Sequence, residues 1–498
     1  MTGSLIVPLI ILIPLIGAIV TMFLSGSKGR YAWIVATAVA AVDLVLCVYM
    51  MFVGDYAAGD YDFEASWIDT AGLKMSLIFE VDGLSILMLF LTAFLEVIVM
   101  VFSYKERDQP GKFFTLLLLI EVGLMGVYTA ADYFLFYIMW EITLIPMYFL
   151  ISWYGGPRRH YSAIKFFIYT HVASLVMLIG IFALAFEAAA IAGGVVDFSF
   201  EAIKAVAAGF DLVFQVVVFG LLFFGFLVKM PAVPFHTWLP DAHTEAPTAG
   251  SVLLAGVMLK MGSYGIIRIN LEVLPAGAAE WQWVMIIMGI LAAVYGAYAC
   301  IAQRDLKKMV AYSSISHMGL VMMSMGFLSD IGIQFAVFQM FAHGLISAML
   351  FMVCGWLGHS VGTREIPLLG GLAAKLPKLA GMMMFCFMAS LGLPGLIGFW
   401  GEFGIIFGFY EFLVDQDMIY LLVFSLLSLL LTAGYYLWAM QRTLFGDLTD
   451  KIDLSHAHDF NRVEMVCLGV LVIAIVVYGL WPDLALDFIN TYYLIGVI

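Results

Sequence analysis

FGFLVKMPAVPFHTWLPDAHTEAP, residues 224–247, places a lysine and a run of prolines in a hydrophobic segment that is otherwise typical of a membrane span. The segment 211–239 exceeds the roughly 20 residues that one straight crossing needs. Pro231 and Pro234 remove helical donors and clash with the preceding turn, so the helix is predicted to break just after Lys229. Broken backbone at membrane depth persists only against protein or water. Where the broken backbone lines a water-filled cavity, and an amine lies beside it, the arrangement is typical of an ion or proton site in a transporter.

The composition excludes a soluble globular protein. Of the 498 residues, 64% are hydrophobic and 12% are charged, and the mean hydropathy is +1.05. These values are typical of a polytopic membrane protein. The net charge of −14 argues against a nucleic-acid partner. The five cysteines are scattered singly without metal-ligand spacing, so they are expected to be small buried hydrophobic residues.

Hydropathy predicts an all-α polytopic membrane protein with about fourteen transmembrane helices. The expected spans are 4–24, 31–53, 82–104, 112–131, 132–153, 162–191, 211–240, 247–272, 281–302, 306–328, 331–358, 376–412, 417–444 and 463–481. Most of the 22 lysines and arginines fall in one set of alternate loops between these spans. Because basic residues favour the cytoplasmic side, both termini are expected on the outer side.

Two interrupted spans indicate an internal repeat. The seventh span breaks at Pro231, and the twelfth breaks at LGLPGLIGFWGEF, around Pro394. Because an odd shift of five helices reverses the direction of entry, spans 4–8 and 9–13 are expected to form an inverted pair. The single transmembrane domain then divides into 1–111 (helices 1–3), 112–272 (first repeat), 281–446 (second repeat) and 447–498 (a cytoplasmic loop and helix 14). The acidic segment 54–82 is expected as a solvated outer loop.

Six titratable side chains lie near the middle of predicted spans: Glu141, Lys229, Lys260, His317, His343 and Glu402. A central charge costs about 2.5–3.5 kcal/mol on insertion scales, so several in one chain need a reason. Burial raises the proton affinity of Glu141 and lowers that of Lys229. A neighbouring opposite charge has the reverse effect on each. A change in the separation of these two groups is therefore expected to switch the proton affinity of Lys229. The structural alternative is a static ion pair that docks two helices.

A proton chain is predicted to continue from Lys260, which lies too deep in its span to reach the surface easily. His317 and His343 titrate near neutrality and can pass a proton between two ring nitrogens. Either histidine alone is better interpreted as a hydrogen-bonded core residue, but together with Lys260 and Glu402 they form a plausible chain. Small residues beside Lys260 permit close helix packing and room for water: Gly256, Gly262, Ser263 and Gly265.

Other titratable residues within or beside the spans have open roles. A functional and a structural role are equally favoured for Glu121, whereas Asp43, Glu96 and His171 are more simply structural because none adjoins a break. His236 and His243 either feed protons in or cap the helix fragments at the first break. His456 and His458 in the loop 445–461 are interpreted as solvated rather than as metal ligands.

Four segments resemble the antiporter-like subunits of respiratory complex I, which are related to subunits of multisubunit Na+/H+ antiporters. They are WEITLIPMYFLISWYGG, KMPAVPFHTWLPDAHTEAPTAGSVLLAGVMLKMG, DLKKMVAYSSISHMG and LGLPGLIGFWGEF, and the likeness covers roughly residues 113–445. The resemblance implies fourteen helices with an inverted five-helix repeat. It also implies a proton path through Glu141, Lys229 and Lys260 to an exit group on the twelfth helix. The M-type subunits resemble this chain in having a glutamate there, Glu402, whereas their paralogues carry lysine.

The resemblance further implies the function, the partners and the location. It implies redox-driven proton pumping by a subunit of a proton-translocating NADH:quinone oxidoreductase in the bacterial inner (cytoplasmic) membrane. No cofactor is expected in this chain, because NADH, FMN, iron–sulfur clusters and quinone belong to partner subunits. The expected partners are other membrane-arm subunits, including neighbouring antiporter-like subunits, together with the lipid bilayer and the transported protons.

Two other functions remain open at this stage. A Na+/H+ antiporter subunit would use the same groups but would take its driving energy from an ion gradient. A glutamate rather than a lysine at residue 402 favours the redox-driven pump over this antiporter. A membrane redox protein with its own haem would need histidine ligands stacked across helices, which an absorbance spectrum would reveal. A membrane redox protein that binds quinone instead of haem belongs to the same alternative.

Overall fold

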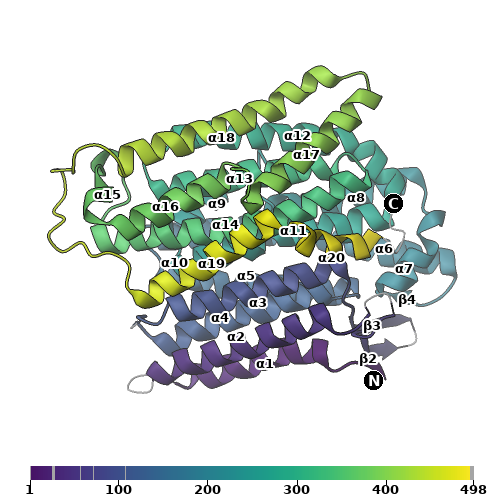
Figure 1. Ribbon diagram of the computed structural model, residues 1–498. Helices are drawn as coiled ribbons and strands as arrows, with labels where there is room; N and C mark the ends of the chain where they lie inside the picture. The colour runs from purple at the N-terminus through teal and green to yellow at the C-terminus, as the bar shows by residue number, and fades with distance from the viewer. Residues whose placement is uncertain (1, 25–28, 56–57, 71, 107, 494–498) are drawn as a thin grey trace.

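The computed structural model describes residues 2–24, 29–55, 58–70, 72–106 and 108–493. Its long helices lie side by side in one bundle, with a small sheet at one end (Figure 1). The α-helices are α1 (Ile6–Met22), α2 (Gly29–Phe52), α3 (Gly83–Phe102), α4 (Pro110–Thr129), α5 (Tyr133–Tyr154), α6 (Arg159–Ala192), α7 (Phe200–Val206), α8 (Leu212–Lys229), α9 (Trp238–Glu245), α10 (Thr248–Leu253), α11 (Leu259–Gly265), α12 (Pro275–Ile301), α13 (Leu306–Met325), α14 (Asp330–Val361), α15 (Leu372–Lys375), α16 (Pro377–Ser390), α17 (Ile397–Asp415), α18 (Leu422–Thr443), α19 (Arg462–Leu480) and α20 (Asp483–Tyr493). The strands are β1 (Thr2–Gly3), β2 (Phe63–Thr70), β3 (Leu73–Phe79) and β4 (Val196–Asp197).

Tighter and wider helical turns complete the secondary structure. Two π-helical segments, η3 (Leu254–Met258) and η4 (Ile266–Leu271), flank α11. The 3₁₀ turns are η2 (Ala207–Gly209), η5 (Ile366–Leu368) and η6 (Ile419–Leu421). We call the end of the bundle that holds the sheet and α7 the sheet end, and the opposite end the α15 end (Figure 1).

The polytopic all-α fold is confirmed. Within the described part of the chain, twelve helices are long and apolar enough to cross a membrane by length and composition. Every predicted span contains a helix, including the two spans that correspond to the 17-residue α1 and to α13. The number of membrane crossings and the inverted repeat stay predictions. So does the orientation inferred from the basic residues, of which Lys28 and Arg107 lie outside the described residues.

Both interrupted spans break where their prolines and glycines predict. The first helix, α8, ends at Lys229, and α9 begins only at Trp238. In the second span, α16 ends at Ser390 and α17 begins at Ile397. Gly392 and Gly395 in this second break have φ values of +79° and +92°, which residues with a side chain rarely adopt.

The acidic segment 54–82, expected as a solvated loop, instead contains two paired strands. β2 and β3 are antiparallel and form the centre of a four-stranded sheet in the order β1-β2-β3-β4. Phe63 and Ala65 alternate with exposed residues along the start of β2, which is the period of a half-buried strand. Of the acidic residues that suggested a loop, Glu64 lies between these two apolar residues and Asp69 is exposed further along the same strand. Asp132 joins the sheet to α5, because its carboxylate accepts hydrogen bonds from the Ser76 and Phe134 amides at 3.1 and 2.9 Å.

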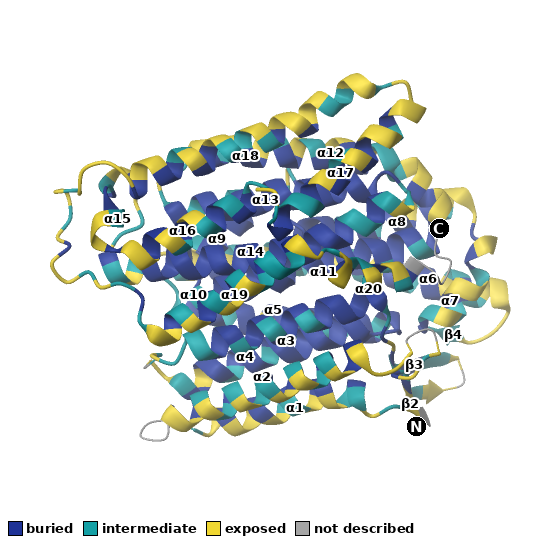
Figure 2. Cartoon of the chain, in the orientation of Figure 1, coloured by how far each residue is buried: buried dark blue, intermediate teal, exposed yellow. Residues whose placement is uncertain are grey.

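Burial is deepest along the centre of the bundle, in α14 and the segment Thr248–Leu271, whereas outer helices such as α18 have exposed faces (Figure 2). The most apolar stretch of α14 is entirely buried, whereas only about a third of the corresponding stretch of α6 is buried. A helix that is buried on all sides is typical of a membrane-protein core. The C-terminal helix α20, which hydropathy does not predict, packs on α3 and α14 at the sheet end.

Candidate functional site

Lys229 is buried at the C-terminal end of α8, where the first broken span is interrupted. Among the residues that the structure describes, its ammonium nitrogen has no hydrogen-bond partner. It lies 5.4 Å from the ring centroid of Trp140 and 5.9 Å from that of Phe166. Aromatic faces attract a cation, so two rings partly replace the water that this amine has lost. Lys229 is therefore held near α5 and α6 without a fixed proton acceptor.

Glu141 is not locked in an ion pair with Lys229, because no contact within 4.0 Å joins them in the described chain. Its Oε2 atom lies 3.0 Å from Nδ1 of His171, and its Oε1 atom accepts a hydrogen bond from the Ser174 hydroxyl. Both partners come from α6, three residues apart and therefore on one face of that helix. His171, interpreted from sequence as structural, is thus a direct partner of Glu141. The signal that points to it is a polar pair, histidine and serine, at helical spacing within an apolar span.

Lys260 lies on α11 between the π-helical segments η3 and η4. Its ammonium donates to the carbonyl of Ala255 in η3 and lies 2.8 Å from Nδ1 of His343 on α14. Because an ammonium is only a donor, Nδ1 of a neutral His343 is the acceptor when Lys260 is charged. π-Helical turns are frequent at functional sites, and here they bracket the one deeply buried lysine of this helix.

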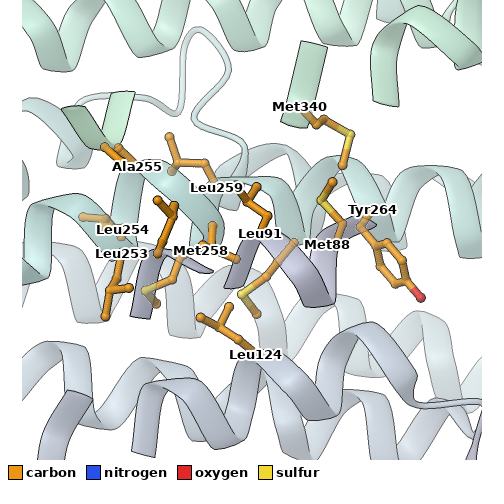
Figure 3. Packing of buried hydrophobic residues seen from close by; sticks show 14 of the residues in the cluster. Met88, Leu91, Leu124, Leu253, Leu254, Ala255, Met258, Leu259, Tyr264 and Met340 are labelled. Carbon is orange, nitrogen blue, oxygen red and sulfur yellow. The ribbon is translucent and has the colours of Figure 1, made fainter. Parts of the chain in front are cut away.

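An apolar shell surrounds the helix that carries Lys260 (Figure 3). Leu91 of α3 lies beside Met258 and Leu259, and Met340 of α14 lies beside Met88 of α3, all within one buried apolar cluster that also includes Leu124 of α4. On another side, a Cβ atom added at Gly262 would lie only 2.5 Å from the carbonyl oxygen of Phe226. The small residues near Lys260 therefore bring α11 close to α8, as their sequence positions suggest.

His343, His317 and Glu402 continue the chain from Lys260. The ring centroids of His343 and His317 are 5.5 Å apart. Nδ1 of His317 lies 3.2 Å from Oε1 of Glu402, at angles outside those of a hydrogen bond. All four side chains are buried. A small rotation of either His317 or Glu402 would align their polar atoms for proton transfer.

A hydroxyl branch leaves His317 on its other ring nitrogen. Nε2 lies 3.2 Å from the Ser390 hydroxyl, which lies 2.7 Å from the Tyr436 hydroxyl. Tyr436 in turn donates to Ser313 at 3.1 Å. Sequence patterns did not single out Ser313, Ser390 and Tyr436. Serine and tyrosine are common in apolar helices, and these three side chains meet only in the folded bundle.

The second break makes room for Glu402. A Cβ atom at Gly392 would lie 2.5 Å from Oε2 of Glu402, and one at Gly401 would collide with Oε1 of Gln339. The bulky Trp400 points away from the site, since its indole donates to the carbonyl of Gly479 on α19 at 2.7 Å. The glycines of LGLPGLIGFWGEF thus allow the carboxylate to lie beside the interrupted backbone.

The structure joins four of the six predicted residues, Lys260, His343, His317 and Glu402, by successive side-chain contacts. No described contact links Lys229 to Lys260. Asp43, Glu96 and Glu121 are fully buried on α2, α3 and α4, without hydrogen-bond partners in the described chain and outside this series of contacts. Within the described ranges, no group of three or more histidine, cysteine or acidic side chains is arranged to hold a metal ion.

Known proteins match the chain over nearly its whole length. The transmembrane family described as NADH:quinone oxidoreductase/Mrp antiporter matches residues 130–432. F(420)H(2) dehydrogenase subunit M of Methanosarcina mazei is 41% identical, covering 96% of this chain and 95% of the relative. NADH-quinone oxidoreductase subunit M of Escherichia coli is 38% identical over 96% of this chain and 95% of the relative.

A solved structure supports the same assignment. A chain of respiratory complex I from Thermus thermophilus with bound NADH superposes with a TM-score of 0.85 and is 27% identical. The match covers 97% of this chain and 99% of that chain. The chain therefore belongs to the NADH:quinone oxidoreductase/Mrp antiporter family of membrane subunits.

Proposed function

We propose that this chain is a proton-translocating membrane-arm subunit of an NADH-quinone oxidoreductase, with electron transfer confined to partner subunits. One observation carries the proposal: Lys260, His343, His317 and Glu402 form a buried series of contacts that ends at a broken helix. Titratable groups in a membrane interior are costly and mark ion or proton pathways. Two broken spans bound this series, as in transporters whose sites lie at interrupted helices.

The first half of the path depends on where Glu141 points. In the structure, His171 and Ser174 hold its carboxylate. If a charge change in a neighbouring subunit brings Glu141 to about 4 Å from Lys229, the pair interacts by about 4 kcal/mol at an effective dielectric constant of about 20. That energy corresponds to about a thousandfold change in the proton affinity of Lys229. Releasing Glu141 back to His171 would then drive the proton from Lys229 toward Lys260.

The second half of the path runs through side chains already in contact. Lys260 donates to Nδ1 of His343, and the ring passes a proton onward from its other nitrogen. His317 receives it and delivers it to Glu402, with the Ser390 hydroxyl as a further hydrogen-bond partner. The chain itself supplies neither oxidant nor reductant in these steps, so NADH, FMN, iron–sulfur clusters and quinone are assigned to partners.

The electron donor is a property of the partners. One relative is named for NADH and quinone and another for F420H2, although both match this chain over almost its entire length. A Na+/H+ antiporter subunit remains the second candidate, because the matching family also includes Mrp antiporters. Sodium-dependent proton transport in vesicles lacking NADH would favour that candidate.

Finer features belong to the same proposal. The protein lies in the bacterial inner membrane with both termini outward, which the distribution of lysine and arginine supports. Residues 112–272 and 281–446 form inverted repeats, which the matching positions of the two broken spans support. Helices 1–3 (residues 1–111) precede the repeats, and residues 447–498 follow them.

The test replaces Glu141 or Lys229 by alanine in the assembled enzyme in sealed vesicles. Each variant is expected to lose proton pumping, measured as protons moved per electron transferred. A full proton-to-electron ratio in either assembled variant would contradict the proposal.

A further inference from the structure

The hydroxyl branch beside His317 is anchored at its far end by the backbone. Ser313 donates its hydroxyl proton to the carbonyl oxygen of Val310, about one turn earlier on α13, at 2.8 Å. A carbonyl oxygen only accepts hydrogen bonds, and a serine hydroxyl has a single proton to donate. Ser313 therefore only accepts from Tyr436, whose hydroxyl lies 3.1 Å from its oxygen. The backbone thus sets the direction of the first link in the branch.

The remaining links follow from the same count of donors. Because Tyr436 gives its one proton to Ser313, its oxygen accepts from Ser390 at 2.7 Å. Ser390 has then used its own proton, so at 3.2 Å from Nε2 of His317 it only accepts. Nε2 therefore carries a hydrogen, and Nδ1 of a neutral His317 is left with a lone pair. Each of the three hydroxyl residues is at most 3% exposed, so the branch is shielded from bulk water.

The opposite order of donors is less stable by one hydrogen bond. In that order Ser313 donates to Tyr436, and the carbonyl of Val310 loses its bond from Ser313. One hydrogen bond favours an arrangement by about fivefold. The branch therefore favours the tautomer of His317 that has its hydrogen on Nε2.

The free nitrogen of this tautomer faces Glu402. Nδ1 of His317 lies 3.2 Å from Oε1 of Glu402, and the ring of His343 also faces His317, with centroids 5.5 Å apart. The hydrogen bond made by one ring nitrogen decides which nitrogen is available for proton transfer. A lone pair on Nδ1 and a carboxylate oxygen are both acceptors, so at this distance they favour a proton between them. His317 and Glu402 thus form a site for one proton.

We infer that Ser313, Tyr436 and Ser390 are positioning residues that hold a hydrogen on Nε2 of His317, so that His317 accepts and donates the transported proton at Nδ1. A proton that reaches His317 from His343 binds to Nδ1. Its transfer to Glu402 breaks this N–H bond and forms an O–H bond, and its release leaves a neutral ring and a carboxylate. The inference rests on the proposed function, which places His317 and Glu402 on the proton path.

A proton outlet is the alternative role for the branch. An outlet would require Ser313 to turn its hydroxyl proton away from Val310 and to pass it to another acceptor. The two roles differ in whether pumping depends on Glu402.

The experiment measures proton pumping by the assembled complex in sealed vesicles at a fixed rate of electron transfer. Ser313→Ala removes the acceptor of the Tyr436 proton without touching His317. The Tyr436 proton then turns to Ser390 and the Ser390 proton to Nε2, which moves the ring hydrogen to Nδ1. Pumping is expected to fall about tenfold, because a proton bound at Nδ1 must first displace a hydrogen bond to the charged Glu402.

Ser314→Ala is the matched control. Ser314 is the next residue on α13 and is equally buried, and its hydroxyl lies 3.4 Å from the same Val310 carbonyl but outside the branch. This variant is expected to pump at the wild-type rate.

Ser313→Thr separates positioning of the proton from packing. Threonine keeps a hydroxyl that can bond to the preceding turn of the helix, but it adds a methyl group. Positioning predicts that Ser313→Thr pumps close to the wild-type rate and better than Ser313→Ala, and the reverse order overturns the inference. Should the Ser313 variants not assemble, Tyr436→Phe keeps the ring, removes the acceptor of the Ser390 proton and should also lower pumping about tenfold. Wild-type pumping in assembled Ser313→Ala or Tyr436→Phe overturns the inference.

Glu402→Gln distinguishes failure of this inference from failure of the proposed function. If Glu402→Gln loses pumping while Ser313→Ala pumps normally, only the assignment of the His317 tautomer is wrong. If Glu402→Gln pumps normally, the last step of the proposed function has failed. Reduced pumping in Ser313→Ala would in that case identify the branch as an outlet and overturn the positioning role.

Discussion

Gly392→Ala tests whether the second broken span exists to accommodate Glu402. The backbone of Gly392 has φ +79°, where an alanine costs about 1–2 kcal/mol. The new Cβ would lie 2.5 Å from Oε2 of Glu402, closer than ordinary contact by about 1 Å. The flexible carboxylate can move aside at little cost in stability, but it then leaves its position 3.2 Å from Nδ1 of His317. A displacement of about 1 Å in a reacting group lowers rates by about 100-fold.

Gly446→Ala is the matched control. Gly446 has φ +84° and nothing within 4 Å of the added Cβ, so it reproduces the backbone strain without any contact with the path. Both variants are expected to lose a similar, small amount of thermal stability. Proton pumping into sealed vesicles, followed with a pH-sensitive dye at a fixed rate of electron transfer, should fall only in Gly392→Ala.

One outcome of this comparison would refute a role for Glu402 as the outlet. If assembled Gly392→Ala pumps as many protons per electron as Gly446→Ala, Glu402 does not need its position beside His317. The series from Lys260 would then end elsewhere, with the Ser390 and Tyr436 hydroxyls as the remaining outlet.

Two further predictions concern side-chain partners. His171→Ala removes a hydrogen-bond partner of the Glu141 carboxyl group, so proton pumping should fall about tenfold, whereas His160→Ala near the start of the same helix should have no effect. At the sheet end, burial acts to raise the pKa of Asp197, but hydrogen bonds from Ser199 and Lys74 outweigh it and lower the pKa below 3.8. This carboxylate therefore stabilises the fold above pH 3.8 and loses its effect as pH falls through its folded pKa. The difference in melting temperature between wild type and Asp197→Asn should shrink below pH 3.8, and a difference that stays constant would contradict the ion pair.

Sequence patterns predicted the parts of the molecule in which a proline or a charged residue interrupts an apolar segment. Pro231 inside an apolar segment locates the first break, and a lysine or glutamate within a span is conspicuous for its cost. Succession of helices predicts the order Lys260, His317, His343 and Glu402, but the structure places His343 beside Lys260 and His317 beside Glu402. Their contact distances depend on helix rotation, which no single helix reveals.

The missed features depend on relations between elements. His171 becomes significant only when α6 is rotated so that it faces Glu141 on α5. The strand β2 was hidden by its acidic residues Glu64 and Asp69, which are exposed on the strand. The π-helical turns around Lys260 arise in a sequence that is compatible with an ordinary helix. Each of these features is determined by packing between elements rather than by the conformational preferences of the local sequence.

The hydrogen bond from the Trp400 indole to the Gly479 carbonyl joins α17, which carries Glu402, to α19. Gly479 also touches the backbone of Gly395, since an added Cβ would lie 2.5 Å from that carbonyl oxygen. The interrupted helix beside Glu402 is therefore seated on α19. A truncated protein that lacks α19 would retain every proton-carrying group named above and yet lose the support that fixes the final one in place.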